Sequence, residues 1–151
     1  MEYSLDNKTF AAAIPTGTNA GTYKVYYRSN GNGTYDTVTG EEPVSVTIAK
    51  AVPTVTAPKA KTGLVYTGQP QALIEAGTTT GGTMEYSLNG TTFATTIPTE
   101  TNAGAYTVYY RANGNTNYET VTGQATVSVT IAKAVPTVTA PKAQTGLVYN
   151  G

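Results

Sequence analysis

Catalytic chemistry has few candidates in this sequence. Its 151 residues include no histidine and no cysteine, which excludes the commonest general base and all thiol chemistry. Glu75, Glu100 and Glu119 could contribute oxygen ligands to calcium, but the Asp-x-Asp-x-Asp-Gly spacing of a calcium loop is absent. We therefore expect no catalytic residues, no cofactor and no metal site.

Lys59, Lys61 and Glu85 carry the amine and carboxyl groups that an intramolecular Lys–Asn isopeptide crosslink requires. Such a crosslink also needs a buried lysine and an asparagine on a facing strand. Both lysines follow Pro58 in a polar stretch, and the last predicted strand has no asparagine. Solvated lysines are therefore the favoured interpretation.

Tyrosines provide a candidate surface for binding a ligand. Tyr109 and Arg111 fall on the outward face of a predicted strand, Tyr118 follows in a loop, and Tyr26 repeats the position of Tyr109. Aromatic rings with a polar tip suit sugar stacking. Cross-strand packing of exposed aromatics is the alternative, and we favour it. A module that binds carbohydrate or host protein is therefore our second hypothesis of function.

These tyrosines are positioned by the stretch from Thr101 to Arg111, which occurs again, with two changes, as Thr18 to Arg28. Its second half alternates with period two, as a half-buried strand requires. The inward face receives Tyr106, Val108 and Tyr110, and the outward face receives Thr107, Tyr109 and Arg111. We expect this stretch to be the central strand of a β-sandwich.

The residues that lead into this strand match a tyrosine corner. Asn102 and Gly104 are turn residues, and Tyr106 follows the glycine by two positions. In such a corner the ring is buried and the hydroxyl bonds to nearby backbone, and the corner marks immunoglobulin-like sandwiches. The first occurrence of the motif consists of Asn19, Gly21 and Tyr23.

Composition and charge define the class of protein. Threonine occurs 31 times, beside 12 tyrosines, 16 glycines and 8 prolines, so strand formers alternate with turn formers and an all-β chain is predicted. Nine basic and nine acidic residues cancel, which argues against nucleic acid as a partner. No stretch approaches the roughly 20 apolar residues of a membrane span, so we expect no membrane insertion within this chain.

The sequence repeats itself with a period of 83 residues, since Met1 to Gly68 aligns with Met84 to Gly151 without a gap. The copies differ at 17 of the 68 aligned positions, and none of these positions carries Met, Val, Ile, Leu, Phe or Tyr in the first copy. This distribution predicts that the apolar residues fill one closely packed core, while the polar surface varies.

A fixed period of this length indicates tandem copies of one folding unit. The proline-bearing stretch 131–136 and its copy 48–53 mark the boundaries. We expect one complete unit over 51–133, the rear part of a preceding unit over 1–50, and the opening strands of a following unit over 134–151. Met1 occupies the position of Met84, so we interpret the chain as a piece of a longer protein.

The complete unit is predicted to contain seven or so short strands. Asn89-Gly90 predicts a hairpin turn, 78–83 a glycine-threonine turn, and 113–118 a polar loop. We expect Met84, Tyr86 and Leu88 to point inward, as well as Val127, Val129 and Ile131. The remaining predicted strands are a proline-bounded edge strand over 51–58, a short strand over 63–68, an inner strand over 71–76 and the last strand over 125–133.

Four motifs follow one another in this unit. They are Leu64 to Gly68, Met84 to Leu88, Asn102 to Tyr109 and Val127 to Lys133. In this order they resemble the tandem Ig-like repeats, of the MBG type, of large bacterial surface proteins, and the resemblance covers the whole chain. It implies immunoglobulin-like antiparallel β-sandwiches arranged end to end, secretion to the cell surface or cell wall, and stalks that project an adhesive or catalytic head. It implies no catalytic residue.

Our first hypothesis of function is therefore a non-catalytic structural stalk whose partners are the neighbouring repeats of the same parent chain. The connection at 133–136 is short and stiffened by proline, so successive units should be extended. Residues 134–151 copy residues 51–68, so they could complete the 1–50 segment of another molecule by strand addition. Such head-to-tail self-association does not close on itself.

Overall fold

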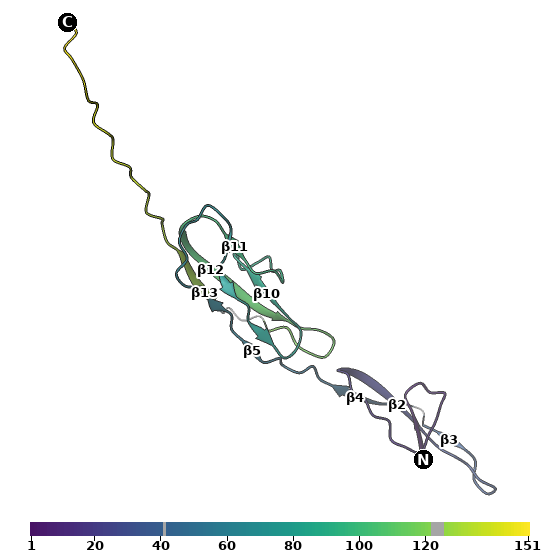
Figure 1. Ribbon diagram of the computed structural model, residues 1–151. Coiled ribbons are helices and arrows are strands. Elements are labelled where there is room, and N and C mark those ends of the chain that lie inside the picture. The colour runs from purple at the N-terminus through teal and green to yellow at the C-terminus, as the bar shows by residue number, and fades with distance from the viewer. Residues whose placement is uncertain (41, 122–125) are drawn as a thin grey trace.

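The computed structural model describes residues 1–40, 42–121 and 126–151. These residues form strands and loops with no helix, so the expected all-β class is confirmed. Two groups of strands follow each other along the chain, and residues 134–151 continue as an extended tail (Figure 1). None of the described residues belongs to a helix long and apolar enough to cross a membrane.

Strand β2 organises residues 1–50. The strands there are β1 (Glu2–Ser4), β2 (Gly21–Ser29), β3 (Val38–Thr39) and β4 (Val44–Ile48). β2 pairs antiparallel with each of the other three. Its register places Tyr23 opposite Val46 and Tyr27 opposite Tyr3, pairings of aromatic and β-branched residues that favour a pleated sheet.

In residues 51–133, one three-stranded antiparallel sheet lies beside several short strand pairs. β12 lies between β10 and β13, and the pairs are β5 with β9, β6 with β8 and β7 with β11. The bounds are β5 (Val55–Thr56), β6 (Lys59–Ala60), β7 (Gln71–Ala72), β8 (Ile74–Glu75), β9 (Thr78–Thr79), β10 (Thr83–Ser87), β11 (Thr99–Glu100), β12 (Gly104–Asn113) and β13 (Thr126–Ile131).

These two layers share one core. Leu73 and Ile74, from the β7–β8 segment, pack with residues of the three-stranded sheet. The arrangement resembles a β-sandwich, in which each layer buries one face against the other. The inward orientation expected for part of the sheet is confirmed, because the sheet contributes Tyr86, Val108, Val129 and Ile131 to the buried cluster.

The chain reverses at Asn89-Gly90 as predicted, but the turn is wider than the tight hairpin turn that was expected. The backbone pairs Tyr86 with Ala94 through hydrogen bonds of 2.7 and 3.0 Å, which leaves a loop much longer than two residues. The loop is wide because Asn89 Oδ1 accepts hydrogen bonds of 2.9 Å from the amides two and three residues further on. Gly90 has a φ of 73°, in the left-handed region that favours glycine.

Two further expectations for strand positions differ from the structure. Leu88 is 39% exposed rather than inward, because β10 ends at Ser87 and the alternation stops there. The stretch 63–68 contributes one parallel bridge, Val65 with Ala132, instead of a strand. The last strand begins at Thr126, while Ala125 lies outside the described residues.

The opening of the unit also pairs differently from the prediction. Within 51–58, only β5 forms, between Pro53 and Pro58, which have no N–H to donate to a ladder. Lys59, expected in a loop, lies in β6. Residues 78–83, expected as a turn, contain β9 and the first residue of β10. β9 is extended because it pairs antiparallel with β5.

The inner face of β4 is open, in contrast to that of β13. Val44 and Val46 are 55% and 47% exposed, whereas Val129, which is the copy of Val46, is 3% exposed. In the complete unit, β6 packs against β13 and pairs with β8. Residues 1–50 contain no copy of these two strands, so the apolar side chains of β4 remain uncovered.

This contrast predicts different costs for one substitution at matched positions. Val129→Ala should lower the unfolding free energy of residues 51–133 by about 2 kcal/mol, because it leaves a cavity in a packed core. Val46→Ala should cost about 0.5 kcal/mol or less, as at other surface positions. Hydrogen exchange of the β12 and β2 amides in denaturant would measure both, and equal costs would contradict the difference in burial.

The loop after β1 depends on an ionised carboxylate. Asp6 Oδ1 accepts hydrogen bonds from the amides of Thr9 and Lys8, each at 2.8 Å, and from the Ser4 hydroxyl at 2.7 Å. These bonds, the one from the Thr9 amide above all, hold the pKa of Asp6 far below its ordinary value. The second copy has the neutral Asn89 at this position.

The depressed pKa makes the first loop sensitive to acid and spares the second. The stabilisation by Asp6 is complete above the carboxyl's unfolded pKa of about 3.9, and it is lost as the pH falls through the lower folded value. We expect the Thr9 amide signal of the folded protein to stay fixed in NMR spectra down to about pH 4 and to shift only well below it, as the Asp6 carboxylate becomes protonated, while the Thr92 signal stays fixed throughout. Asp6→Asn should abolish the pH dependence; a shift that persists in this variant would contradict the assignment.

Candidate functional site

Residues 1–50 meet the complete unit at a joint, formed by Asn19, Ala20 and Lys50 on one side and the loop 115–118 on the other. Asn117 is central: its Oδ1 accepts a hydrogen bond from the Ala20 amide at 2.8 Å, and its Nδ2 donates to Asn19 Oδ1 at 3.0 Å. Lys50 Nζ donates to the carbonyl oxygen of the first loop residue at 3.0 Å. A carboxamide that both donates and accepts fixes orientation as well as proximity.

The loop 115–118 is held in place by its own contacts. Asn115 Oδ1 accepts hydrogen bonds from the amides of Asn117 and Tyr118, at 2.9 and 3.1 Å. The Ala51 amide donates to the Asn117 carbonyl oxygen, and the Ala51 carbonyl oxygen accepts from the Glu119 amide just after the loop, each at 2.9 Å. The Tyr118 ring covers Gly81, where an added Cβ would lie only 2.3 Å from the ring. The Asn117 carboxamide is therefore presented from a loop that is fixed on three sides.

Both copies of the tyrosine-corner motif make the same hydrogen bond. The Tyr106 hydroxyl donates to the Asn102 carbonyl oxygen at 2.8 Å, and the Tyr23 hydroxyl donates to the Asn19 carbonyl oxygen at 2.8 Å. Both rings are half-buried, rather than buried as the sequence suggested. Each bond ties the strand to the backbone four residues earlier and so fixes the turn between them.

The first of these corners is part of the joint. The Asn19 carbonyl receives the Tyr23 hydroxyl, while the Asn19 side chain receives Nδ2 of Asn117. Two residues later, Gly21 has a φ of 150°, which L side chains rarely adopt. Gly104, at the same position of the second corner, lies close to its tyrosine, since an added Cβ would lie 3.5 Å from the hydroxyl. The corner thus positions Asn19 and Ala20, which form one side of the joint.

The tyrosines predicted to face a ligand do not gather in one patch. Tyr109 is half-buried against Gly90, where an added Cβ would lie 3.3 Å from the ring, and Tyr118 covers Gly81. These glycines precede and follow β10, so the two rings pack at opposite ends of that strand. Tyr26 is half-buried in β2, in the other unit.

Arg111, predicted to face outward beside Tyr109, is already engaged within the sheet. Its Nε and Nη2 both lie 2.7 Å from Glu85 Oε2, and its guanidinium lies 4.3 Å from the centre of the Phe93 ring. This cluster was not predicted from the sequence, although its three residue types recur unchanged in the first copy. There the matching residues are Glu2, Phe10 and Arg28.

The acidic and lysine candidates remain scattered. Lys59 is exposed opposite Glu75 in the β6–β8 pair, and the Glu85 carboxylate is taken up by Arg111 and by Asn113 Nδ2 at 3.0 Å. Across the described parts of the chain, no three acidic side chains come together as a metal site would require. The joint is therefore the most specific polar arrangement from which function can be inferred.

No protein-family model, curated protein or solved structure matches this chain. The resemblance to tandem Ig-like repeats therefore stays a prediction from the sequence motifs and the repeat.

Replacing Asn117 tests the joint directly, and the first copy supplies the substitution because it has Thr34 at this position. Asn117→Thr should make amide exchange at Ala20 about fivefold faster, the effect of losing about 1 kcal/mol of net hydrogen bonding. NMR relaxation should also show that 1–50 and 51–133 tumble more independently.

Thr34→Asn is the matched control, because Thr34 lies outside the joint. In dilute solution it should change neither measurement. If Asn117→Thr behaved like this control, the carboxamide would have no role in holding the two units together.

Proposed function

We propose that this chain is a non-catalytic spacer, part of the stalk of a bacterial surface protein of the adhesin type. Its immunoglobulin-like repeats, arranged end to end, project a distal functional domain away from the cell, outside the cytoplasm and at the cell surface or wall. The observation that carries this proposal is the joint between 1–50 and 51–133.

The joint supports the proposal because it connects the end of one unit to the beginning of the next through side chains. The peptide linkage at Lys50 to Ala51 alone would allow the units to swivel. The carboxamide of Asn117 reaches back 97 residues to the Ala20 amide and so adds a second point of attachment. Two attachments at separate points oppose bending, as a spacer that sets distance requires.

The arrangement in Figure 1 is consistent with this role, since the two groups of strands lie one after the other and the tail leaves from the far end. The longest strand, β12, has ten residues. Ten residues at about 3.3 Å each, together with a joint, give about 35 to 45 Å per repeat. The number of repeats would then set the reach of the stalk.

An inserted repeat tests the proposal. A second copy of residues 51–133 placed after Lys133 keeps every existing contact and adds one unit. We expect small-angle X-ray scattering of the monomer to show a maximum dimension that is about 35 to 45 Å longer. Asn117→Thr in both copies should broaden the distribution of dimensions without changing the fold of each unit.

A compact, side-by-side pair of units, with little change in maximum dimension, would overturn the spacer role. Binding of the unmodified chain on a glycan array would instead favour the second hypothesis, a carbohydrate-binding module.

A further inference from the structure

β10 lies at the edge of its sheet, and the loop that follows it folds back along that edge. The sheet runs in the order β10, β12, β13, so the described strands of this sheet lie on one side of β10. On the other side, Tyr86 and Ala94 exchange two backbone hydrogen bonds, of 2.7 and 3.0 Å. We call residues 88–94 the strap. Backbone groups on an exposed sheet edge can pair with another chain, so a segment that occupies the edge has a protective effect.

The alternation of β10 determines which backbone groups point to this edge. Tyr86 bonds through both its N–H and its C=O to Ala94, so these groups point away from β12. Met84 lies opposite Ala112, which bonds to Val121 instead of to β10. Backbone groups alternate along an antiparallel ladder, so Met84 presents its N–H and C=O to the edge as Tyr86 does. The strap therefore covers one of the positions from which edge pairing could start.

An arginine of the middle strand fastens the strap. Arg111, in β12, lies opposite Glu85 of β10. Its guanidinium lies 4.3 Å from the centre of the Phe93 ring, and Phe93 is the strap residue next to Ala94. A guanidinium over an aromatic face is attracted to it electrostatically. The Arg111 side chain thus connects the middle strand to the strap across β10.

The guanidinium is itself held in a fixed direction. Its Nε and Nη2 both lie 2.7 Å from Glu85 Oε2, and Glu85 Oε1 accepts a hydrogen bond from Asn113 Nδ2 at 3.0 Å. The Glu85 side chain is 14% exposed. A planar guanidinium that makes two bonds to one carboxylate is oriented as well as attracted. Arg111 therefore faces Phe93 without further ordering.

The first copy contains the same arrangement. Tyr3 and Ala11 exchange hydrogen bonds of 2.8 and 3.0 Å, and the Arg28 guanidinium lies 4.3 Å from the centre of the Phe10 ring and 2.8 Å from a Glu2 oxygen. The tip of the strap differs between the copies at three consecutive positions, 6–8 and 89–91. The fastening at the foot of the strap is thus kept while its tip changes.

We propose that the strap guards the β10 edge against pairing with β10 of a second copy of this chain, and that Arg111 is the positioning residue that keeps it closed. When the strap opens, the backbone groups of Tyr86 join those of Met84 at the edge. A second copy is the partner that fits, because two identical strands can pair antiparallel about a two-fold axis and offer each other the same groups.

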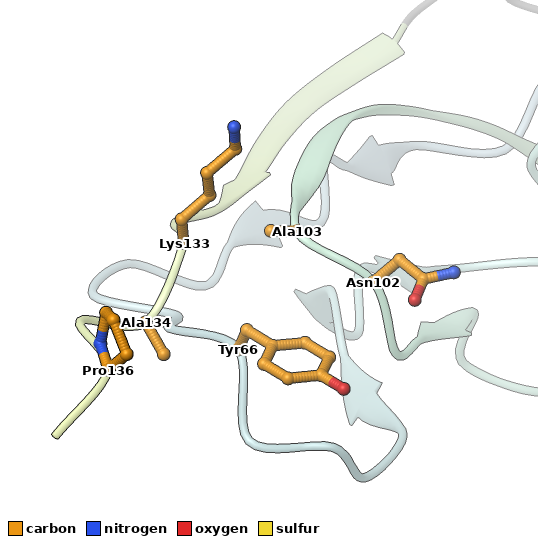
Figure 2. A pocket seen from close by; sticks show the side chains of 6 residues that line it. All are labelled: Tyr66, Asn102, Ala103, Lys133, Ala134 and Pro136. Carbon is orange, nitrogen blue, oxygen red and sulfur yellow. The ribbon is translucent and has the colours of Figure 1, made fainter. Parts of the chain in front are cut away.

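The strap lies apart from the surfaces at the ends of the unit. The joint uses the loop 115–118, and a pocket beside the start of β12 is walled by Tyr66, by Asn102 and Ala103, and by the residues that follow β13 (Figure 2). In the described structure, residues 88–94 line neither surface. Changes in the strap therefore leave the spacer contacts in place, and this inference does not depend on the proposed function.

The first test is opening of the strap in the full chain, measured by hydrogen exchange. Phe93→Ala should make exchange of the Ala94 amide at least about threefold faster, because the contact with the guanidinium is lost. Phe93→Leu, which keeps an apolar side chain without a ring, should also make it faster. The Val108 amide reports unfolding of the sheet and the Ala11 amide reports the strap of the first copy, and both should exchange at unchanged rates.

The second test is self-association, followed by sedimentation over a range of concentrations. Phe93→Ala should associate at lower concentration than the unmodified chain, although it removes apolar surface, and exchange of the Met84 amide should slow as the complex forms. Unchanged exchange at Ala94, or equal acceleration at Val108, would show that Phe93 does not hold a separate strap. Association equal to that of the unmodified chain, or association that leaves Met84 exchange unchanged, would overturn the role of the strap as an edge guard.

Discussion

Pairing along both edges of β12 is the constraint on which the complete unit depends. β10 and β13 each follow its register, and the alternation of its side chains decides which face they bury. Val108 is fully buried against the second layer, whereas Arg111 is held on the other face by Glu85. A slip of one residue would exchange these faces, so the register and the core specify each other.

The same strand also connects the core to the ends of the unit. Its first turn is fixed by the hydroxyl of a tyrosine corner, and its last residues lead into the loop that carries the joint. In the first copy, the backbone of Asn19 serves the corner while its side chain serves the joint. The hydrogen bond that fixes this turn thereby also positions a side chain of the joint.

The sequence predicts the parts of the structure that follow from local alternation. The central strand, the burial of Val129 and Ile131 and the all-β class are of this kind. The two-residue pairs such as β5 with β9 could not be predicted, because their register comes from tertiary packing and not from a pattern. The inward orientation predicted for Leu88 was wrong, because β10 ends at Ser87 and the hydrogen bonds of Asn89 already shape the loop that follows. The joint also escaped it, since Asn117 replaces the first copy's threonine and bonds 97 residues away.

The parallel bridge between Val65 and Ala132 has a mechanical consequence. It joins a segment near the beginning of residues 51–133 to one near their end, so tension applied to the two ends of this segment of the chain pulls them in opposite directions along the bridge. The two hydrogen bonds, from Ala132 to Leu64 and from Tyr66 to Ala132, are loaded in shear and must break together. Bonds that are opened one at a time, as in a zipper, yield at lower force. A pair of backbone contacts, modest at equilibrium, can thus delay rupture of the whole unit under a pull.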